Sequence, residues 1–287
     1  MNRKKIGIHT FMALPAFLLF LIFFIYPLLR GIGMSLTDWN GISKANFIGL
    51  KNFIDFFKDK RAISDIRTTL LFALGSAPLL NIVGLSYALL MNSKFKGKSI
   101  ARMFIYMPAI ISPLIMGYIW SLLLQPGRGY IHHMLEKIGW AQGLGNWMSS
   151  YWSTMLVLIL VNVWQYAGMT MVIYLAGLQS IPDELYESAK IDGASSIKQF
   201  KYITLPLLEP SIRINVVTNI IGSLSVFDVV MSLTGGGPGY QTETLSIYIM
   251  RMCYGSKTGY STAVAIIMFF IILIPVIISL RLTRAKE

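Results

Sequence analysis

Long runs without a charged residue dominate this sequence and restrict the folds open to it. Residues 11–29 contain no Asp, Glu, Lys or Arg, and residues 138–182 form a second, longer run of this kind. A helix needs about 20 mostly apolar residues to cross a bilayer. Lipid offers no partner to backbone N–H and C=O groups, so helices satisfy them within the segment. The sequence therefore predicts an all-α integral membrane protein, and a hydrophobic content of 55% agrees with this class.

Six membrane-spanning helices are predicted, all within a single transmembrane domain. A secretory signal peptide would have a shorter apolar core and a small-residue cleavage site, so the first run is interpreted as a retained span. The predicted spans cover residues 11–33, 68–91, 103–124, 154–179, 212–233 and 260–280. An even number of spans places both termini on one side of the membrane.

Positive charge predicts which side that is. Lys94, Lys96, Lys98 and Arg102 fall within ten residues, which is typical of a cytoplasmic turn. Both termini are then cytoplasmic, and 14 of the 25 Lys and Arg residues lie on that side. The net charge of +12 is explained by this orientation and by contact with anionic membrane lipid, without nucleic acid as a partner.

A polar loop is predicted at residues 180–211, between the fourth and fifth spans. Nine charged residues fall between positions 183 and 213, directly after the charge-free run. Such a segment belongs in water between two membrane-buried helices.

The loop contains signals for two short helices. Ser180 and Asp183 have the spacing of a capping box, which predicts a helix start. Gly193 supplies the left-handed residue that commonly ends a helix. Ser195 or Ser196 then caps a second helix. The loop is therefore predicted to be an elbow of two helices that meet at Gly193.

The residues of this loop resemble those of a known family. Glu-Ser-Ala at 187–189, Asp-Gly-Ala at 192–194 and Ile-Thr-Leu-Pro at 203–206 resemble the Glu-Ala-Ala…Gly…Leu-Pro loop of ATP-binding-cassette importer permeases. Ser188 stands where that family usually has Ala. The resemblance implies a type I importer permease fold whose cytoplasmic coupling loop docks in a cleft of a separate ATPase subunit. It assigns the ATPase-coupling role to Glu187, Ala189, Asp192, Gly193, Ala194, Phe200, Leu205 and Pro206.

A second segment narrows the resemblance to sugar uptake. Phe227-Asp228, the run Leu-Thr-Gly-Gly-Gly-Pro-Gly-Tyr at 233–240 and Tyr248 resemble the signature of carbohydrate-uptake permeases homologous to the larger maltose permease subunit, also called the multiple-sugar type. This implies ATP-driven import of an oligosaccharide or glycoside across a bacterial or archaeal cytoplasmic membrane. The implied partners are a homologous second permease subunit, two cytoplasmic ATPase subunits and an extracytoplasmic sugar-binding protein.

The chain is not predicted to be an enzyme. Gly97-Lys98-Ser99 looks like the end of a phosphate-binding loop, but Asn92 stands where that motif needs a glycine. No catalytic residue and no metal site are predicted. No cofactor is expected on this chain, and ATP and Mg would bind the partner ATPase.

Polar side chains at helical spacing mark a candidate substrate path. Such stripes are costly in lipid and should face inward. The predicted path comprises Asn162, Gln165, Tyr166, Met169, Asn219, Ser223 and Asp228. Pro108 and Pro113 in the third span would provide a kinked wall, and Trp164 with Tyr166 would suit a neutral sugar. Packing between helices is the alternative role for the amides.

A secondary active transporter of a small polar solute is the alternative function. Polar residues in broken helices near the middle of the membrane would serve it equally well. It gives no reason for the elbow at 180–211, and uptake measured with ATP depleted would separate the two functions.

Overall fold

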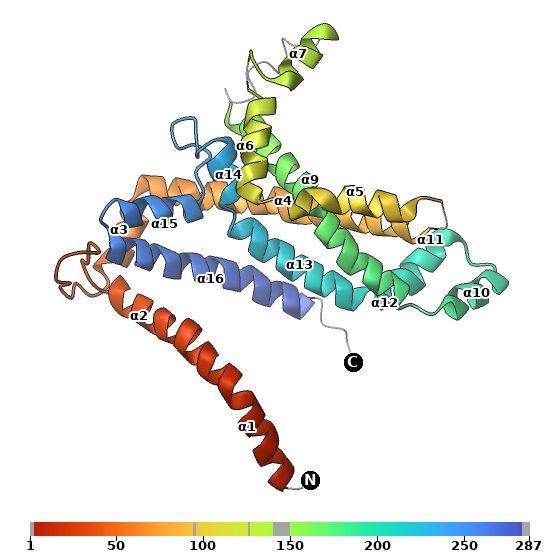
Figure 1. Ribbon diagram of the computed structural model, residues 1–287, viewed down its shortest axis with the longest axis horizontal. Coiled ribbons are helices and arrows are strands. Elements are labelled where there is room, and N and C mark those ends of the chain that lie inside the picture. The colour runs from red at the N-terminus through yellow and green to blue at the C-terminus, as the bar shows by residue number, and fades with distance from the viewer. Residues whose placement is uncertain (1–2, 94–95, 126, 140–149, 283–287) are drawn as a thin grey trace. The chain divides into compact units, whose positions relative to one another are not determined.

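The described part of the chain is helical, which confirms the predicted all-α class (Figure 1). This computed structural model describes residues 3–93, 96–125, 127–139 and 150–282, with side chains from Met12 onward. Within these ranges the one β-type pairing is an isolated bridge between Thr37 and Phe47. Contacts divide the chain into two compact units, one of Met1–Ile63 with Tyr248–Phe269 and one of Ser64–Ile247 with Phe270–Glu287.

The helices follow one another with few long connections. The first ones are α1 (Arg3–Phe20), a π-helical turn (Leu21–Ile25), α2 (Tyr26–Ser35), α3 (Lys51–Lys58), α4 (Lys60–Asn92), α5 (Lys98–Ile110), α6 (Pro113–Leu123) and α7 (Tyr130–Lys137). The later ones are α9 (Tyr151–Gln179), α10 (Asp183–Ile191), α11 (Ser196–Gln199), a π-helical turn (Phe200–Thr204), α12 (Leu205–Leu207), α13 (Glu209–Leu224), α14 (Asp228–Leu233), α15 (Leu245–Tyr254) and α16 (Thr258–Leu282).

Several of these helices are long and apolar enough to cross a membrane. Within the described ranges they are Met12–Ser35, Lys60–Asn92, Tyr151–Gln179 and Thr258–Leu282. A fifth candidate is the pair α5 and α6, which is bent by 96° where the two helices meet. The structure thus contains four or five candidate spans by length and composition, against the six predicted.

The segment predicted as the third span is broken into two helices. Pro113 occupies the first turn of α6, and Ser112 before it is extended, with φ −50° and ψ 130°. A residue that precedes proline is driven out of the helical region by the proline ring. Pro108 in contrast stays inside α5. The break therefore has a local steric cause, which acts at Pro113 alone.

The segment predicted as the fifth span, residues 212–233, is also two helices. α13 ends at Leu224, and α14 begins at Asp228. At the end of α13 the Ser225 hydroxyl donates to the Ile221 carbonyl, at 2.7 Å. The Val226 carbonyl, which lies in the gap, accepts from the Thr244 hydroxyl at 3.0 Å. A side chain from a later segment thus pairs a carbonyl of the gap, and the Ser225 hydroxyl adds a second bond at the last turn of α13.

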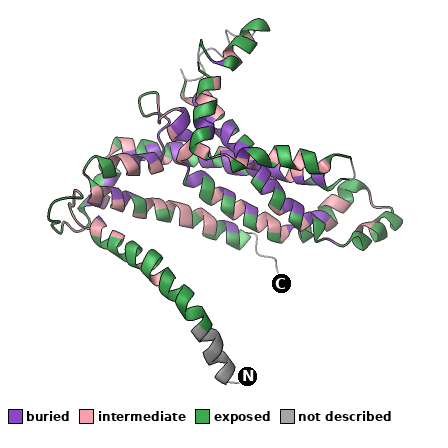
Figure 2. Ribbon diagram, viewed as in Figure 1, coloured by how far each residue is buried: buried purple, intermediate pink, exposed green. Residues whose placement is uncertain are grey.

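The unit that contains Ser64–Ile247 is built around α9. Figure 2 shows buried residues along α9 and α14. One apolar cluster joins Phe72 and Leu80 of α4, Leu158 of α9 and Val230 of α14. A second cluster joins α4 and α9 farther along, through Met91, Met171 and Leu178 among others. α9 is therefore the helix around which this unit packs.

The other unit is tied together by polar contacts at the start of α4. The Asp59 carboxylate caps that helix by accepting from the backbone N–H groups of Arg61 and Ala62, at 2.8 and 3.3 Å. It also accepts from the Tyr248 hydroxyl at 2.5 Å. Burial acts to raise the pKa of Asp59, but these hydrogen bonds outweigh it and the pKa is lowered.

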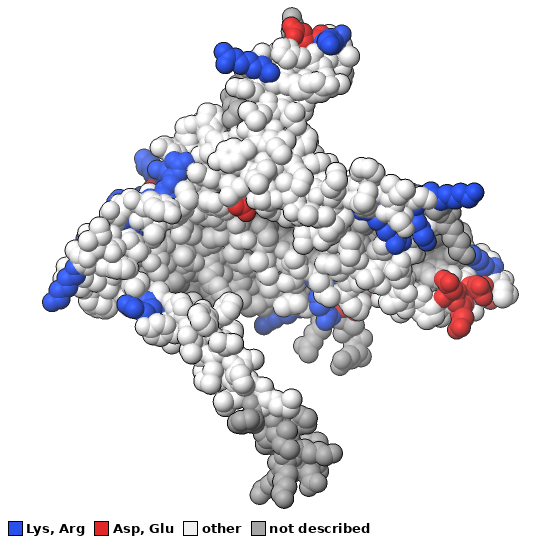
Figure 3. Space-filling view, in the orientation of Figure 1, with Lys and Arg blue, Asp and Glu red and all other residues white. Residues whose placement is uncertain are grey.

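Charged side chains are unevenly distributed over the helices. Figure 3 shows wide surfaces without Lys, Arg, Asp or Glu, and the charged groups gather near helix ends and connections. Acidic residues at the start of α10 and basic residues near the start of α5 belong to these connections. This distribution is the one expected when the uncharged helical surfaces lie in lipid.

The contact between α5 and α9 depends on Gly168. A Cβ atom at this position would lie 2.4 Å from the Ile105 carbonyl oxygen and 2.8 Å from the Tyr106 Cα. Both are backbone atoms, which cannot move aside cheaply. We predict that Gly168→Ala destabilises the protein by about 1–3 kcal/mol, as overpacking commonly does. A lower thermal midpoint of the purified protein in detergent is the expected result.

Gly33→Ala is the matched control, because an added Cβ there meets no atom within 4 Å. This control should leave the thermal midpoint unchanged. Equal midpoints for the Gly168 and Gly33 variants would show that the close approach of α5 to α9 is not needed.

Candidate functional site

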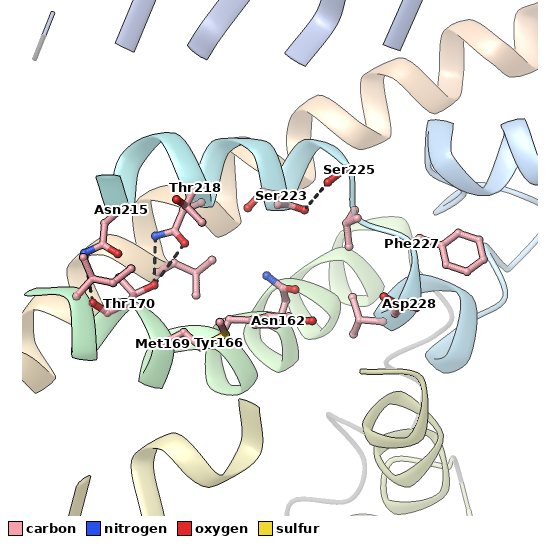
Figure 4. A pocket seen from close by; sticks show the side chains of 16 residues that line it. Asn162, Tyr166, Met169, Thr170, Asn215, Thr218, Ser223, Ser225, Phe227 and Asp228 are labelled. Carbon is pink, nitrogen blue, oxygen red and sulfur yellow. Dashed lines mark hydrogen bonds between the residues drawn. The ribbon is translucent and has the colours of Figure 1, made fainter. Parts of the chain in front are cut away.

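A cavity of about 350 Å³ lies between α9, α13 and α14 (Figure 4). Its wall combines amide, hydroxyl and carboxylate side chains with apolar ones, all from one unit. The lining residues are Leu80, Asn162, Tyr166, Met169, Thr170, Ile173, Asn215, Thr218, Asn219, Gly222, Ser223, Ser225, Val226, Phe227, Asp228 and Val229. α13 and α9 each contribute a row of side chains at helical spacing. The break after α13, the first turn of α14 and Leu80 of α4 contribute the rest.

The α13 row contacts α9 through hydrogen bonds near one end of the cavity. Asn215 donates from its amide to the Thr170 carbonyl oxygen, at 3.3 Å. The side-chain oxygen and the side-chain nitrogen of Asn219 each lie 3.3 Å from the Thr170 hydroxyl oxygen, within hydrogen-bonding distance. Buried amides therefore link the two helices here, which is the packing role that the sequence left open for Asn219.

Asn162 also has a partner within the protein. Its amide donates to the Ser76 hydroxyl of α4 at 2.7 Å, and the residue is buried although it lines the cavity. A hydrogen bond of this kind holds α9 to α4. Asn162 consequently contributes to packing whatever else it does.

Ser223 differs from these amides. It is only 2% exposed and lines the cavity, but its hydroxyl has no hydrogen-bond partner among the residues that the structure describes. A buried polar group without a partner is costly, by about 1–3 kcal/mol. A hydroxyl of this kind can be satisfied by a polar ligand or by water in the cavity.

Asp228 supplies the one carboxylate of the lining, at the first residue of α14. It is half-buried. No Lys, Arg or His occurs among the described lining residues. The cavity can therefore offer hydrogen bonds and negative charge to a solute, but no positive charge.

Six of the seven residues predicted for the substrate path line this cavity. They are Asn162, Tyr166, Met169, Asn219, Ser223 and Asp228. Gln165 lies elsewhere: it is fully buried, and its amide donates to the Ile111 carbonyl at the break between α5 and α6, at 3.3 Å. The structure gives Gln165 a place in helix packing and does not bring it to the cavity.

Two further expectations about the wall are wrong. Trp164 is absent from the lining and packs edge-on against Trp120, with ring centroids 5.3 Å apart. The kinked third span was expected to form a wall, but none of the lining residues found in the described chain belongs to α5 or α6. Trp164 is 45% exposed, so it lies on the outside of α9. The break at Pro113 turns α5 toward α9 and α6 toward α14 instead.

Some lining residues were missed by the sequence reasoning. Asn215 and Thr218 could have been found, because Asn215 precedes Asn219 and Ser223 at intervals of four residues. Thr170 could have been found in the same way, because it follows Asn162 and Tyr166 at intervals of four residues, whereas Phe227 carried no such signal. Their position in the cavity depends on how α9 faces α13 and on the break before α14.

The loop at 180–211 contains the predicted elbow. Gly193 has φ +74° after the end of α10, and the Ala194 N–H donates to the Ala189 carbonyl at 2.8 Å while the Gly193 N–H donates to the Lys190 carbonyl at 3.1 Å. These two bonds are those of a Schellman motif. The prediction of a left-handed helix end at Gly193 is confirmed.

The two caps of the elbow turned out differently. Ser195 caps α11, with its side chain accepting from the Lys198 N–H, as one of the two predicted alternatives. The capping box at Ser180 is wrong, because Ser180 donates back to the Gly177 carbonyl of α9 at 2.7 Å. α10 begins after Pro182 without a side-chain cap. A hydroxyl at the end of a long helix can bond to a carbonyl of that helix instead of capping the next one.

Side-chain contacts hold the elbow in one shape and leave its tip exposed. Tyr186 and Thr204 share a hydrogen bond of 2.9 Å between α10 and the second arm, and the Gln199 amide donates to the Ala194 carbonyl at 3.0 Å. Of the residues assigned to coupling, Glu187, Asp192, Gly193, Leu205 and Pro206 are exposed, and Ala189, Ala194 and Phe200 are half-buried. The elbow thus presents acidic and apolar groups on an ordered frame.

Comparisons with known proteins agree with this architecture. Residues 81–286 match the family model described as "Binding-protein-dependent transport system inner membrane component". A probable starch degradation products transport system permease of Thermoanaerobacterium thermosulfurigenes is 36% identical over 274 residues, which cover 95% of this chain and 92% of that protein. A trehalose/maltose transport system permease of Thermococcus litoralis is 32% identical over 277 residues, covering 96% and 93%.

A solved structure shares the fold. A chain of a bacterial alginate ABC transporter, crystallised in complex with an alginate pentasaccharide-bound periplasmic protein, aligns with a TM-score of 0.82 and 26% identity. The alignment covers 98% of this chain and 95% of that one. With a family model that spans most of its length and relatives above 30% identity, this chain belongs to the family of inner membrane components of binding-protein-dependent transport systems.

Proposed function

We propose that this chain is the permease subunit of an ATP-driven sugar importer. The observation that carries the proposal is the polar cavity between α9, α13 and α14, which contains the Ser223 hydroxyl, a group with no partner among the described residues. Relatives and the solved transporter are permeases for starch products, trehalose or maltose, and alginate. Membership of this family supports a role in transport across a membrane, without an enzyme activity of its own.

The chain crosses the membrane six times in this proposal, with both termini and the elbow in the cytoplasm. The pair α5 and α6 forms one crossing, and α13 with α14 forms another. α13 has 16 residues and is about 24 Å long at 1.5 Å per residue, so α14 completes the span. The short, Lys-rich turn between α4 and α5 supports the assignment of that side as cytoplasmic.

A neutral oligosaccharide or glycoside is the substrate class that the cavity favours. Amide and hydroxyl groups can exchange hydrogen bonds with sugar hydroxyls, and Tyr166 adds an aromatic surface. Asp228 without a nearby basic residue in the lining disfavours a carboxylated or phosphorylated sugar, because like charges repel strongly where water is scarce. The substrate path proposed here runs along Asn162, Tyr166, Met169, Asn219, Ser223 and Asp228.

Three kinds of partner complete the proposed importer. A homologous second permease faces this chain, two cytoplasmic ATPase subunits bind ATP and Mg, and an extracytoplasmic protein delivers the sugar. The alginate transporter with its periplasmic protein supports the last of these. This chain binds no cofactor in the proposal.

The elbow couples the cavity to the ATPase. Exposed acidic residues of α10 and the glycine turn are placed to enter a cleft of a partner subunit, and the contact between Tyr186 and Thr204 transmits movement to the segment that leads into α13. α13 carries one wall of the cavity. A displacement at the elbow therefore reaches the cavity through one continuous stretch of chain.

The proposal is tested by reconstituting the chain with its partner subunits in liposomes. Uptake of a radiolabelled neutral oligosaccharide should require internal ATP and the binding protein. Uptake that persists without ATP and follows an imposed ion gradient would instead support the secondary active transporter.

We predict that Ser223→Ala lowers sugar transport without loss of assembled complex. The hydroxyl has no partner to lose in the described part of the chain, so its removal should leave helix packing intact. A sugar hydroxyl left unpaired by the change costs about 1–3 kcal/mol, or roughly 5- to 150-fold in apparent affinity. Uptake rates at several sugar concentrations, with complex yield measured in parallel, provide the readout.

Asn162→Ala is the comparison for that experiment. It leaves the Ser76 hydroxyl without its donor and should reduce the yield of complex. If Ser223→Ala reduced yield as strongly and left the apparent affinity for sugar unchanged, both residues would be packing residues only.

We predict that Gly193→Val uncouples ATP hydrolysis from sugar transport. At φ +74° a β-branched residue is strained, so the two arms of the elbow would meet at a changed angle. Gly193→Asn is the matched control, because Asn tolerates the left-handed region far better. Sugar-stimulated ATPase activity should fall in the Val variant and survive in the Asn variant. Normal stimulation with Val would rule out a coupling role for the elbow geometry.

We predict that Glu187→Gln weakens binding of the ATPase subunits. Glu187 is exposed on α10, and the change keeps its shape while removing its charge. Glu184→Gln, in the first turn of the same helix, is the control for general effects of charge on that helix. The ATPase content of the purified complex should fall for Glu187 alone, and equal losses in both variants would exclude a specific ionic contact.

A further inference from the structure

α3 has two opposite faces, and one of them is apolar and exposed. Asn52 and Phe56 are buried, whereas Leu50, which precedes the helix, and Ile54 and Phe57 are 64%, 52% and 66% exposed. Successive helical residues are about 100° apart. Positions 50, 54 and 57 therefore fall within about 60° of one another, and positions 52 and 56 fall roughly opposite.

The buried face ties α3 to the end of the first apolar span. The Asn52 amide donates to the Ser35 carbonyl at 2.7 Å and to the Thr37 carbonyl at 2.8 Å. Ser35 is the last residue of the candidate span Met12–Ser35. Because a spanning helix ends near the boundary between acyl chains and head groups, α3 is held at that boundary.

The charged residues beside the apolar face of α3 agree with a position at the boundary between acyl chains and head groups. Lys51 and Lys58 are exposed and lie about 90° around the helix from the apolar face. Lysines in this position can extend toward lipid phosphates while their stems lie along the membrane surface. Leu29 and Ile32 near the end of α2 are exposed apolar residues as well.

We infer that α3 is a lipid-binding interfacial helix, whose exposed face of Leu50, Ile54 and Phe57 inserts into the leaflet at the carboxyl end of α2. An interfacial helix of this kind buries its apolar face by about 5–10 Å. Lys51 and Lys58 contact anionic head groups, and Asn52 holds the helix parallel to the membrane. The inference does not depend on which solute the protein transports.

Site-directed nitroxide labelling of the complete transporter in lipid nanodiscs tests this inference. Cys253 is the one cysteine of the chain, so Cys253→Ser in a complex whose other subunits lack cysteine permits single labels. Labels are placed with Ile54→Cys and Phe57→Cys, and collision with oxygen is compared with collision with a water-soluble nickel chelate. Oxygen concentrates among acyl chains, and the chelate stays in water.

Two further labelled positions serve as references, one for a side chain in water and one for a side chain in lipid. Asp55→Cys lies on a different side of α3, and Phe23→Cys is an exposed position within the first apolar span. We expect the oxygen-to-nickel collision ratio at 54 and 57 to lie between those at 55 and 23, and well above that at 55. Nickel collision at 54 and 57 equal to that at 55 would place the face in water and overturn the inference.

A protein occupant would give a different result. Labels at 54 and 57 that collide with neither reagent would show that a subunit covers the face. A nickel collision rate that is high in the transporter alone, and that falls when the sugar-binding protein is added, would assign the face to that protein. Either result also overturns the lipid assignment, and the two labelled positions provide independent reports.

Discussion

The requirement that backbone polar groups be satisfied without water governs this structure. Two segments that the sequence suggested as continuous spans are broken, and each break leaves a carbonyl that lipid cannot pair. Gln165 donates to the Ile111 carbonyl at the first break, and Thr244 donates to the Val226 carbonyl at the second. Polar side chains from other segments therefore make both breaks tolerable, and they hold the broken helices against their neighbours.

The second break has a functional consequence. Because α13 stops at Leu224 and α14 restarts at Asp228, the chain turns away and leaves space beside α9 that polar residues line. The amides of this lining are engaged with Thr170 and Ser76, so they keep the wall rigid. In the proposed function Ser223, Asp228 and Tyr166 meet the solute, and the hydrogen-bonded amides form the frame of the path along which it moves. A frame of this kind can admit a sugar without collapsing when the sugar leaves.

Local chemistry accounts for how much could be predicted. The end of α10 at Gly193 and the cap at Ser195 depend on residues within one or two turns, and they appear as expected. Gln165 was assigned to the cavity because it shares the spacing of Asn162 and Tyr166, but spacing cannot tell which neighbour a helix side contacts. No proline or glycine lies in the break before α14, so the local sequence does not predict it. The break depends on Thr244, which is 18 residues from Val226 along the chain.

Photolabelling of the sugar path tests the central claim most directly. A neutral oligosaccharide that carries a diazirine and is imported by the complete transporter would be activated by light during turnover, and labelled peptides would be identified by mass spectrometry. The account predicts labels on residues of α9 and α13 that line the cavity, such as Met169 and Thr218, and loss of these labels with excess unmodified sugar. Labels confined to other helices, or labels at Met169 and Thr218 that excess sugar does not reduce, would contradict it.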